Sequence, residues 1–103
     1  YVHVADVAAA HVAAALALGR GDALLPVYNL GTGTGTSVRE IMRALAEATG
    51  SAFTPEIGPR RAGDPARIVA SSAAAERDLR WRAERDLADM ARSAAATHPS
   101  RRP

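Results

Sequence analysis

Apolar and polar positions recur along this chain with two different spacings, which predict short strands and helices. Residues 1–4, 24–30, 53–57 and 67–70 are short runs rich in β-branched or apolar side chains, and such runs favour strands. Four helices are expected at residues 7–18, at 38–49, from a cap at Ser71 or Ser72 to Leu79, and from a cap at Asp86 to about Thr97. The pattern therefore predicts an α/β fold in which short strands mix with three or four helices.

The helix expected at residues 38–49 has the clearest signals. Ser37 and Glu40 have the spacing of a capping box, in which each side chain satisfies a backbone amide at the start of the helix. Gly50 follows the last turn, where glycine commonly ends a helix. Apolar side chains recur between these ends at the spacing of a single helix face.

The helix expected at residues 7–18 differs because it is apolar on all sides. It contains only Ala, Val, His and Leu, and Asp6 before it is the expected N-cap. A helix that is apolar all round is normally buried on most sides. The sequence therefore predicts that this helix needs covering material from elsewhere.

Composition points in the same direction. Of the 103 residues, 25 are Ala, and Leu, Ile, Val and Phe together number only 19. Trp81 is the one large anchor near the C-terminus, and a net charge of +2 argues against disorder. Such a thin core favours a piece completed by another domain at least as strongly as an independent domain.

Several classes of protein are excluded or disfavoured. The absence of Cys excludes a disulfide framework, a thiolate nucleophile and a Cys-ligated zinc site. The longest apolar stretch, residues 12–18, is too short to span a bilayer, and we expect no membrane association and no signal peptide. The spacing of His3, His11 and His98 offers no metal site. Basic and acidic residues alternate over 76–86, which indicates a solvated face and argues against nucleic-acid binding.

The glycine-rich stretch at residues 31–36 is the first candidate for chemistry. A strand, then Gly31-x-Gly33, then a helix is typical of a dinucleotide-binding turn, but that motif needs Gly or Ala where Thr36 stands. The ribose-binding acid of that motif would be Glu56, which lies between Pro55 and Gly58. The favoured interpretation is therefore a turn of small residues with a structural role.

The loop at residues 58–65 is the second candidate. Arg60 and Arg61 precede Gly63 and Asp64, and the planar guanidinium group suits bidentate binding of phosphate. A neighbouring carboxylate can accept hydrogen bonds from sugar hydroxyls. A solvated ion pair on a loop is the alternative, and spacing alone favours it. No Ser-His-Asp order stands out as a catalytic set, and the chain has no Lys for a Schiff base or a proton relay.

Together these segments resemble the C-terminal part of UDP-glucose 4-epimerases, in the extended short-chain dehydrogenase/reductase family. The stretches that carry the resemblance are YVHVADVA at residues 1–8, YNLGTG followed by Ser-Val at 28–38, RRAGD at 60–64, LRW at 79–81 and DLADM at 86–90. They follow one another in the family's order over nearly the whole chain. Each stretch is weak alone, but the five in register are specific, although sugar-nucleotide dehydratases and decarboxylases share several.

The resemblance implies a fold, a reaction and a set of site residues. These enzymes have an N-terminal Rossmann domain that holds NAD and a smaller C-terminal part that binds the UDP-sugar, which is oxidised and reduced at C4. By the resemblance Arg61 contacts the UDP phosphates, Asp64 binds the uridine ribose, Ile68 bounds the sugar pocket, and Tyr1 joins the substrate-binding set.

The resemblance also implies that functional parts of the enzyme are missing. The NAD-binding glycine turn and the Tyr-x-x-x-Lys pair of the family do not occur in residues 1–103, so we expect residues 1–98 to be a substrate-binding fragment that is inactive alone, with 99–103 a flexible tail. The expected partners are the missing Rossmann domain and a UDP-sugar, in a cytoplasmic enzyme that is a homodimer. The alternatives are a non-catalytic nucleotide-binding or interaction module, and a fragment of a related dehydratase or decarboxylase.

Overall fold

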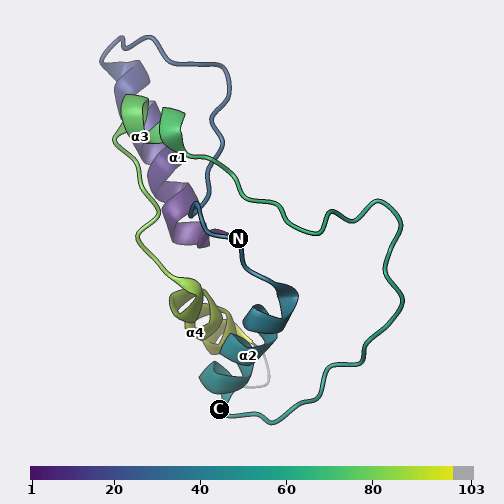
Figure 1. Cartoon of the computed structure of the whole chain (residues 1–103). Coiled ribbons are helices and arrows are strands. Elements are labelled where there is room, and N and C mark those ends of the chain that lie inside the picture. The colour runs from purple at the N-terminus through teal and green to yellow at the C-terminus, as the bar shows by residue number, and fades with distance from the viewer. Residues whose placement is uncertain (99–103) are drawn as a thin grey trace. The chain divides into compact units, whose positions relative to one another are not determined.

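Four helices make up the regular structure of residues 1–98, which are the residues that the computed structural model describes. They are α1 (Val4–Gly19), α2 (Val38–Thr49), α3 (Ala73–Leu79) and α4 (Leu87–Thr97) (Figure 1). The four expected helices are therefore confirmed within a few residues. The tail expected at 99–103 lies outside the described residues.

The expected strands are not found between residues 1 and 98. A strand is defined by a ladder of backbone hydrogen bonds to a neighbouring strand, and the expected segments form no such ladder within this range. Gly31 does lie beside Ala70 and Ser72, but the Ser72 hydroxyl joins the two segments in place of a backbone ladder. The prediction of short strands was wrong for this structure because a strand depends on its partner as well as on its own sequence.

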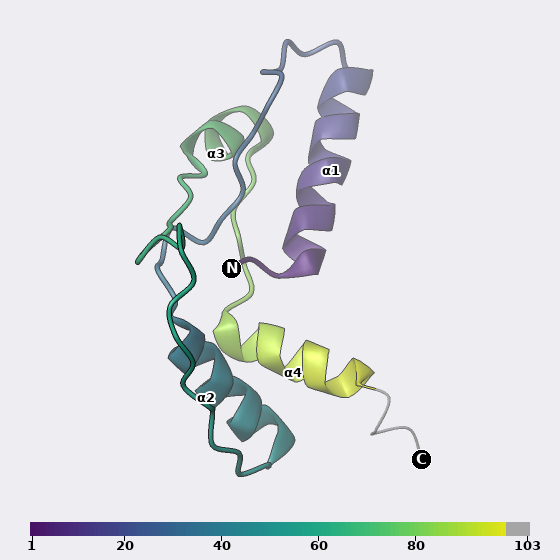
Figure 2. The same cartoon turned by 90° about the vertical axis from the view of Figure 1, so that its right-hand side faces the viewer.

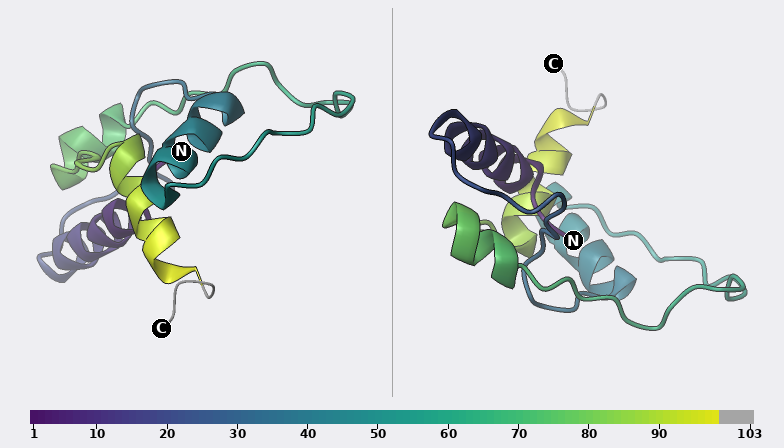
Figure 3. Two further views of the ribbon diagram at one scale, coloured as in Figure 1. Left: turned by 90° about the horizontal axis from the view of Figure 1, so that it is seen from below. Right: turned by 90° about the horizontal axis from the view of Figure 1, so that it is seen from above.

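The chain is organised as two compact units, each assembled from two separate segments. Residues 1–34 and 69–86 form the first unit, which contains α1 and α3; residues 35–68 and 87–98 belong to the second, which contains α2 and α4. Figure 2 and Figure 3 show the helices from further directions. The sequence shows no linker at this division because the chain passes from the first unit to the second and back.

The start of α1 differs from the prediction. The backbone amide of Ala5 donates to Nδ1 of His3, which makes His3 the N-cap in place of Asp6. Asp6 lies inside the first turn and is only 2% exposed. Its carboxylate is engaged with a distant segment, because Oδ2 accepts hydrogen bonds from the backbone amides of Glu84 and Arg85.

The core of the first unit is small and centres on Trp81. The indole is 5% exposed and clusters with Ala10 of α1 and Ala75 of α3. Its Nε1 donates to the backbone carbonyl of Asp6 at 2.7 Å. Trp81 is therefore the anchor that the sequence predicted, and two alanines allow the helices to approach it closely.

The second unit begins with the capping box predicted for α2. The amide of Glu40 donates to Oγ of Ser37, and the amide of Ser37 donates to Oε2 of Glu40. Gly50 ends the helix with φ +68°, in the left-handed region that glycine favours. Helix α4 packs against α2, with Ala91 and Ala95 buried.

No helix within residues 1–98 has the length and hydrophobicity that crossing a membrane would require.

Candidate functional site

The candidate site is the tight turn at residues 60–64, in the second unit. The backbone amide of Asp64 donates to the carbonyl of Arg61 at 3.4 Å, and Gly63 between them has φ +82°. Residues that carry a Cβ atom rarely adopt that backbone angle, so the turn requires glycine at this position. The turn brings the two predicted site residues together, because Nε of Arg61 donates to Oδ2 of Asp64 at 2.9 Å.

Arg60 secures the same turn from its other side. Its Nη2 donates to the backbone carbonyl of Asp64 at 3.0 Å. Asp64 is thus held through its carboxylate by Arg61 and through its carbonyl by Arg60. The two adjacent arginines have different roles, since Arg60 shapes the backbone while Arg61 orients the carboxylate.

The Arg61–Asp64 pair is open to solvent. The Arg61 side chain is 85% exposed and that of Asp64 is 44% exposed. Such an exposed pair contributes little to stability, so its geometry can adapt to a ligand at low cost. Because Nε of Arg61 donates to Asp64, the terminal amino groups of the guanidinium can donate to a second acceptor. Two parallel donors of this kind match a phosphate group.

An open hollow lies beside the turn, and its volume is about 600 Å³. The residues that line it come from the turn and from the start of α2: Ser37, Val38, Arg39, Arg60, Asp64, Pro65 and Ala66. The sequence analysis did not predict that the turn and α2 meet here. No local motif indicates it, because 23 positions separate Ser37 from Arg60 in the chain.

The start of α2 is not itself a free anion site. Its capping carboxylate, Glu40, accepts hydrogen bonds from the amide and the hydroxyl of Ser37 at 2.6 and 2.8 Å. These hydrogen bonds lower the pKa of Glu40 below its ordinary value, so the carboxylate stays ionised. A negative charge already occupies the positive end of the helix, which makes that end a poor site for a further anion.

The other two predicted site residues are exposed. Ile68, in the second unit, is 76% exposed, and Tyr1, in the first unit, is 64% exposed. The Ile68 side chain does not line the hollow beside the turn. Their assignment therefore depends on the resemblance rather than on a contact with Arg61 or Asp64.

The glycine-rich stretch has a structural explanation. A Cβ added at Gly31 would lie 2.9 Å from the Cβ of Ala70, which real structures do not tolerate. The amide of Gly31 donates to Oγ of Ser72 at 2.8 Å, and that hydroxyl donates back to the carbonyl of Gly31 at 2.9 Å. Gly31 is thus needed for a close approach between two segments. Its amide is already engaged, so the stretch does not fit a cradle for a dinucleotide phosphate.

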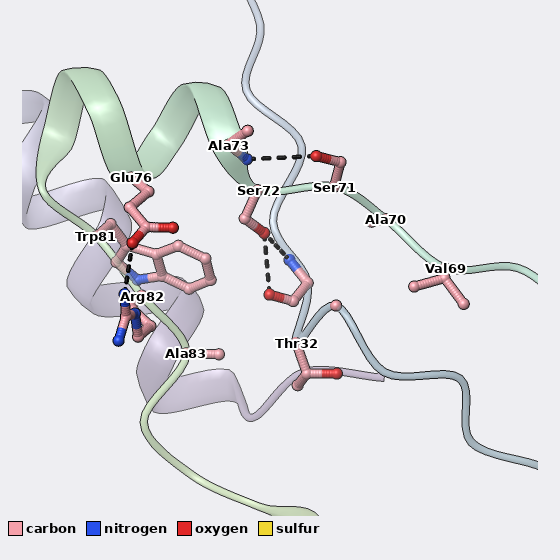
Figure 4. Close-up of a pocket in the computed structure, with 12 residues that line it drawn as sticks. Thr32, Val69, Ala70, Ser71, Ser72, Ala73, Glu76, Trp81, Arg82 and Ala83 are labelled. Atoms are coloured by element: carbon pink, nitrogen blue, oxygen red, sulfur yellow. Dashed lines mark hydrogen bonds and ion pairs between the residues drawn. The ribbon is translucent and has the colours of Figure 1, made fainter.

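A second cavity, of about 520 Å³, opens beside this contact in the first unit (Figure 4). Its polar groups are largely paired with one another. Nη2 of Arg82 lies 2.6 Å from Oε1 of Glu76, and the Ser72 hydroxyl is hydrogen-bonded to the backbone of Gly31. Trp81 forms part of the lining. No sequence motif indicated this cavity, because its walls come from three separate stretches of chain.

Metal-binding groups do not gather anywhere in residues 1–98: no cluster of three or more His, Cys, Asp or Glu side chains could hold an ion there.

Comparison with curated proteins identifies relatives with one shared name. The chain is 42% identical over 92 residues to "UDP-glucose 4-epimerase 4" of Oryza sativa subsp. japonica, a match that covers 89% of this chain and 25% of that protein. It is 44% identical over 85 residues to "UDP-glucose 4-epimerase" of Corynebacterium glutamicum, again covering 25% of the relative. The chain thus spans about a quarter of the length of these relatives. No family model matches it.

Solved structures agree with the sequence comparison. The UDP-glucose 4-epimerase of Stenotrophomonas maltophila, with bound NAD and formylated UDP-arabinopyranose, matches 93% of the chain with a TM-score of 0.82 and 41% identity. The Bifidobacterium longum enzyme, in complex with NAD+ and UDP, matches 92% with a TM-score of 0.79 and 42% identity. Each match covers 28% of the solved chain. The predicted resemblance to UDP-glucose 4-epimerases, of the extended short-chain dehydrogenase/reductase family, is confirmed.

Proposed function

We propose that this chain is the UDP-sugar-binding part of a UDP-glucose 4-epimerase, an NAD-dependent isomerase that interconverts UDP-glucose and UDP-galactose. The observation that carries the proposal is the exposed Arg61–Asp64 pair, joined at 2.9 Å on a turn that Gly63 makes possible. Two relatives that match nearly the whole chain were solved with UDP or a UDP-sugar. A diphosphate linked to a ribose is the kind of ligand that this pair can recognise.

The two side chains divide the ligand between them. The terminal amino groups of Arg61 donate to oxygens of the diphosphate, which carries the negative charge of the ligand. Asp64 uses Oδ2 for Arg61, and Oδ1 can accept a hydrogen bond from a ribose hydroxyl. The tight turn places the two residues side by side, so the diphosphate and the ribose can be recognised together.

Ile68 and Tyr1 complete the proposed substrate-binding set. Ile68 follows Asp64 by four residues, and its exposed apolar side chain would bound the space that the hexose occupies. Tyr1 is likewise exposed. Their roles come from the resemblance, and substitution of either residue in a complete enzyme would test them.

The chemical steps belong to residues outside this chain. NAD supplies the hydride acceptor in such an enzyme, and the glycine stretch at 31–36 does not fit it, because Gly31 is committed to Ala70 and Ser72. The chain also has no Lys to assist proton transfer. We propose that NAD binds to a separate Rossmann domain of the complete enzyme, and that this enzyme is a cytoplasmic homodimer.

Titration of the chain with UDP and with uridine tests the proposed roles. Calorimetry or NMR should show that Arg61→Gln weakens UDP binding by about tenfold or more, since a charge-assisted hydrogen bond is worth about 1.5–3 kcal/mol. Uridine binding should change little, because uridine lacks the phosphates. Asp64→Asn should weaken the binding of both ligands.

Arg67→Gln is the matched control for this titration. Arg67 is exposed on the same loop, and its replacement removes the same charge. If Arg67→Gln weakened UDP binding as much as Arg61→Gln, general attraction between charges would explain the binding and the assignment of Arg61 would be wrong.

A further inference from the structure

The C-terminal halves of α1 and α3 line a common hollow in the first unit. The two helices are in contact, and the volume of the open hollow is about 660 Å³. Its charged lining residues are three arginines and two aspartates, namely Arg20, Arg77, Arg80, Asp22 and Asp78. The lining therefore carries one more positive than negative charge, and none of its residues belongs to the Arg61–Asp64 turn.

Two of the three guanidinium groups are paired with the aspartates. Nη2 of Arg20 donates to Oδ2 of Asp22 at 3.0 Å. Nε and Nη2 of Arg77 donate to the two carboxylate oxygens of Asp78 at 2.6 and 3.1 Å. The hydroxyl of Tyr28 also donates to Asp78, at 2.8 Å. Both carboxylates are thus engaged, whereas Nη1 of either arginine can still donate to another acceptor.

Arg80 is the third arginine, and its side chain forms no ion pair within residues 1–98. Its backbone is unusual as well, because φ is +51° and no other non-glycine residue in that range has a positive φ. This left-handed residue ends α3, and the amides of Arg80 and Trp81 both donate to the carbonyl of Ala75. The turn leads the chain to the buried Trp81, but glycine would make it without strain.

The end of a helix does not by itself explain an arginine at position 80. The last carbonyl groups give a helix C-terminus a partial negative charge, which a nearby cation stabilises. For an exposed side chain, this stabilisation is no larger than the cost of a left-handed backbone in a residue that carries a Cβ atom. Backbone strain of this kind clusters at functional positions. The exposed guanidinium of Arg80 is therefore the group of this hollow for which a ligand is the better explanation.

We propose that this hollow binds a phosphate group, with Arg80 as the principal donor and with Arg20 and Arg77 assisting it. A guanidinium group donates two parallel hydrogen bonds to phosphate oxygens. Three guanidinium groups match the three terminal oxygens of a phosphate better than the two oxygens of a carboxylate. The proposal is independent of the proposed function, since it involves neither the UDP-binding residues nor the second unit.

The phosphate group can belong to inorganic phosphate or to an organic phosphate monoester. The hollow also has an apolar wall, formed by Ala13, Leu16 and Leu79. Leu16 is 61% exposed, so an apolar group bound beside the arginines would cover it. An apolar substituent on the phosphate should therefore strengthen binding if the natural ligand is a monoester.

Titration of the 103-residue chain with inorganic phosphate and with phenyl phosphate tests the site, at constant ionic strength so that screening does not change. Two-dimensional NMR of the nitrogen-15-labelled chain follows each backbone amide and each arginine Nε separately. Signals of residues 20–22 and 77–80 should shift and reach saturation, and any binding at the Arg61–Asp64 pair would shift a different set. Tighter binding of phenyl phosphate would identify a monoester as the ligand, and equal or weaker binding would identify free phosphate.

Arg80→Gly is the decisive variant, because binding and stability should respond differently. Phosphate binding at the hollow should weaken by about tenfold or more, since a charge-assisted hydrogen bond is lost. The midpoint of urea unfolding should not fall, because glycine adopts the left-handed backbone readily. Asp22→Asn should strengthen binding severalfold, since it releases Arg20 and removes a negative charge. Arg43→Gln, which removes an exposed charge from α2 in the second unit, is the matched control and should leave the binding unchanged.

Three results would overturn the proposal. High concentrations of phosphate could shift no signal of residues 20–22 or 77–80, which would mean that the hollow binds no phosphate. Arg43→Gln could weaken binding as much as Arg80→Gly, which would mean that general attraction between charges explains it. Arg80→Gly could lower the stability and leave the binding unchanged, which would show that Arg80 stabilises the end of α3 and contacts no ligand.

Discussion

The indole nitrogen of Trp81 donates a hydrogen bond to the backbone carbonyl of Asp6, across 75 positions of the chain, at 2.7 Å. Both residues are almost fully buried. The bond joins the first turn of α1 to the segment that follows α3. The first unit therefore has a polar contact within its small apolar cluster.

Replacement of Trp81 by Phe should destabilise the first unit by about 2 kcal/mol or more, because it leaves a buried carbonyl without a donor and a space where the indole was. Urea unfolding followed by far-ultraviolet circular dichroism would measure the loss. Arg82→Gln is the control, because it removes the charge of the exposed residue that follows Trp81 in the sequence. It should change the free energy of unfolding by less than about 1 kcal/mol. Equal effects of the two changes would contradict the anchoring role of Trp81.

The Asp6 carboxylate should make stability depend on pH in the acid range. Burial raises its pKa, but the backbone amide and guanidinium of Arg85 and the amide of Glu84 outweigh that effect, so the net pKa lies below the ordinary 3.8. A carboxyl group with a lowered pKa in the folded state adds stability that is complete above the unfolded-state value. That contribution is lost as the pH falls through the lowered folded-state value.

The variant Asp6→Asn tests this pH dependence. It should be less stable than the unsubstituted chain at pH 7, and the difference should shrink as the pH falls below about 4. Thermal melts between pH 2 and 7 would show it. Asp64→Asn, which removes an exposed carboxylate, serves as the control. A stability difference that stays constant down to pH 2 would argue against an ionised Asp6 in the folded chain.

Ser72 should matter far more than its neighbour Ser71. The Ser72 hydroxyl both accepts from and donates to the backbone of Gly31, whereas the Ser71 hydroxyl makes one long contact of 3.5 Å to the amide of Ala73. Ser72→Ala should cost about 1–3 kcal/mol, because two backbone groups lose their partner. Ser71→Ala should cost well under half of that. Chemical denaturation of both variants would decide between them.

Gly31→Ala should destabilise the chain through a clash rather than through backbone strain. The added methyl group would meet Ala70 at 2.9 Å, and overpacking of this kind costs about 1–3 kcal/mol. The double variant Gly31→Ala with Ala70→Gly should recover part of the loss, since it removes the nearest atom. If the second change gave no recovery in urea unfolding, the close approach of the two segments would not be the reason for the glycine.

The purified chain should catalyse no interconversion of UDP-galactose and UDP-glucose when NAD is added. The reason is chemical, because the chain has no Lys and its glycine stretch is committed to packing. A coupled assay for UDP-glucose would measure the reaction, with the Corynebacterium glutamicum enzyme as the positive control. Turnover above background would show that the chain holds chemistry that we have not assigned.

Features set by neighbouring residues were predictable from the sequence. The capping box of Ser37 and Glu40 and the glycine end at Gly50 are local, because each joins residues within a few positions of one another. The resemblance to UDP-glucose 4-epimerases was carried by short stretches in a fixed order, and the comparisons confirm it. The Arg61–Asp64 contact is another local feature, since the two residues are three positions apart in the chain.

Features that depend on distant residues were missed or wrongly predicted. Asp6 was expected to cap α1, yet it turns inward because amides 78 and 79 positions away bind its carboxylate, and His3 becomes the cap. The expected strands lack a ladder between residues 1 and 98, since a strand needs a partner that its own sequence does not specify.

The sequence by itself thus determined the four helices to within a few residues, the capping box and glycine end of α2, the tight turn with its arginine and carboxylate, and the resemblance to the epimerases. Only the tertiary structure decided that Trp81 and Asp6 are in contact and that Ala70 leaves no space for a side chain at position 31. It also decided that an apolar face of α1 remains exposed. The physical reason is the separation along the chain between the residues that interact. Caps and turns are closed by residues a few positions apart, whereas burial is settled by whatever surface the folded chain brings alongside.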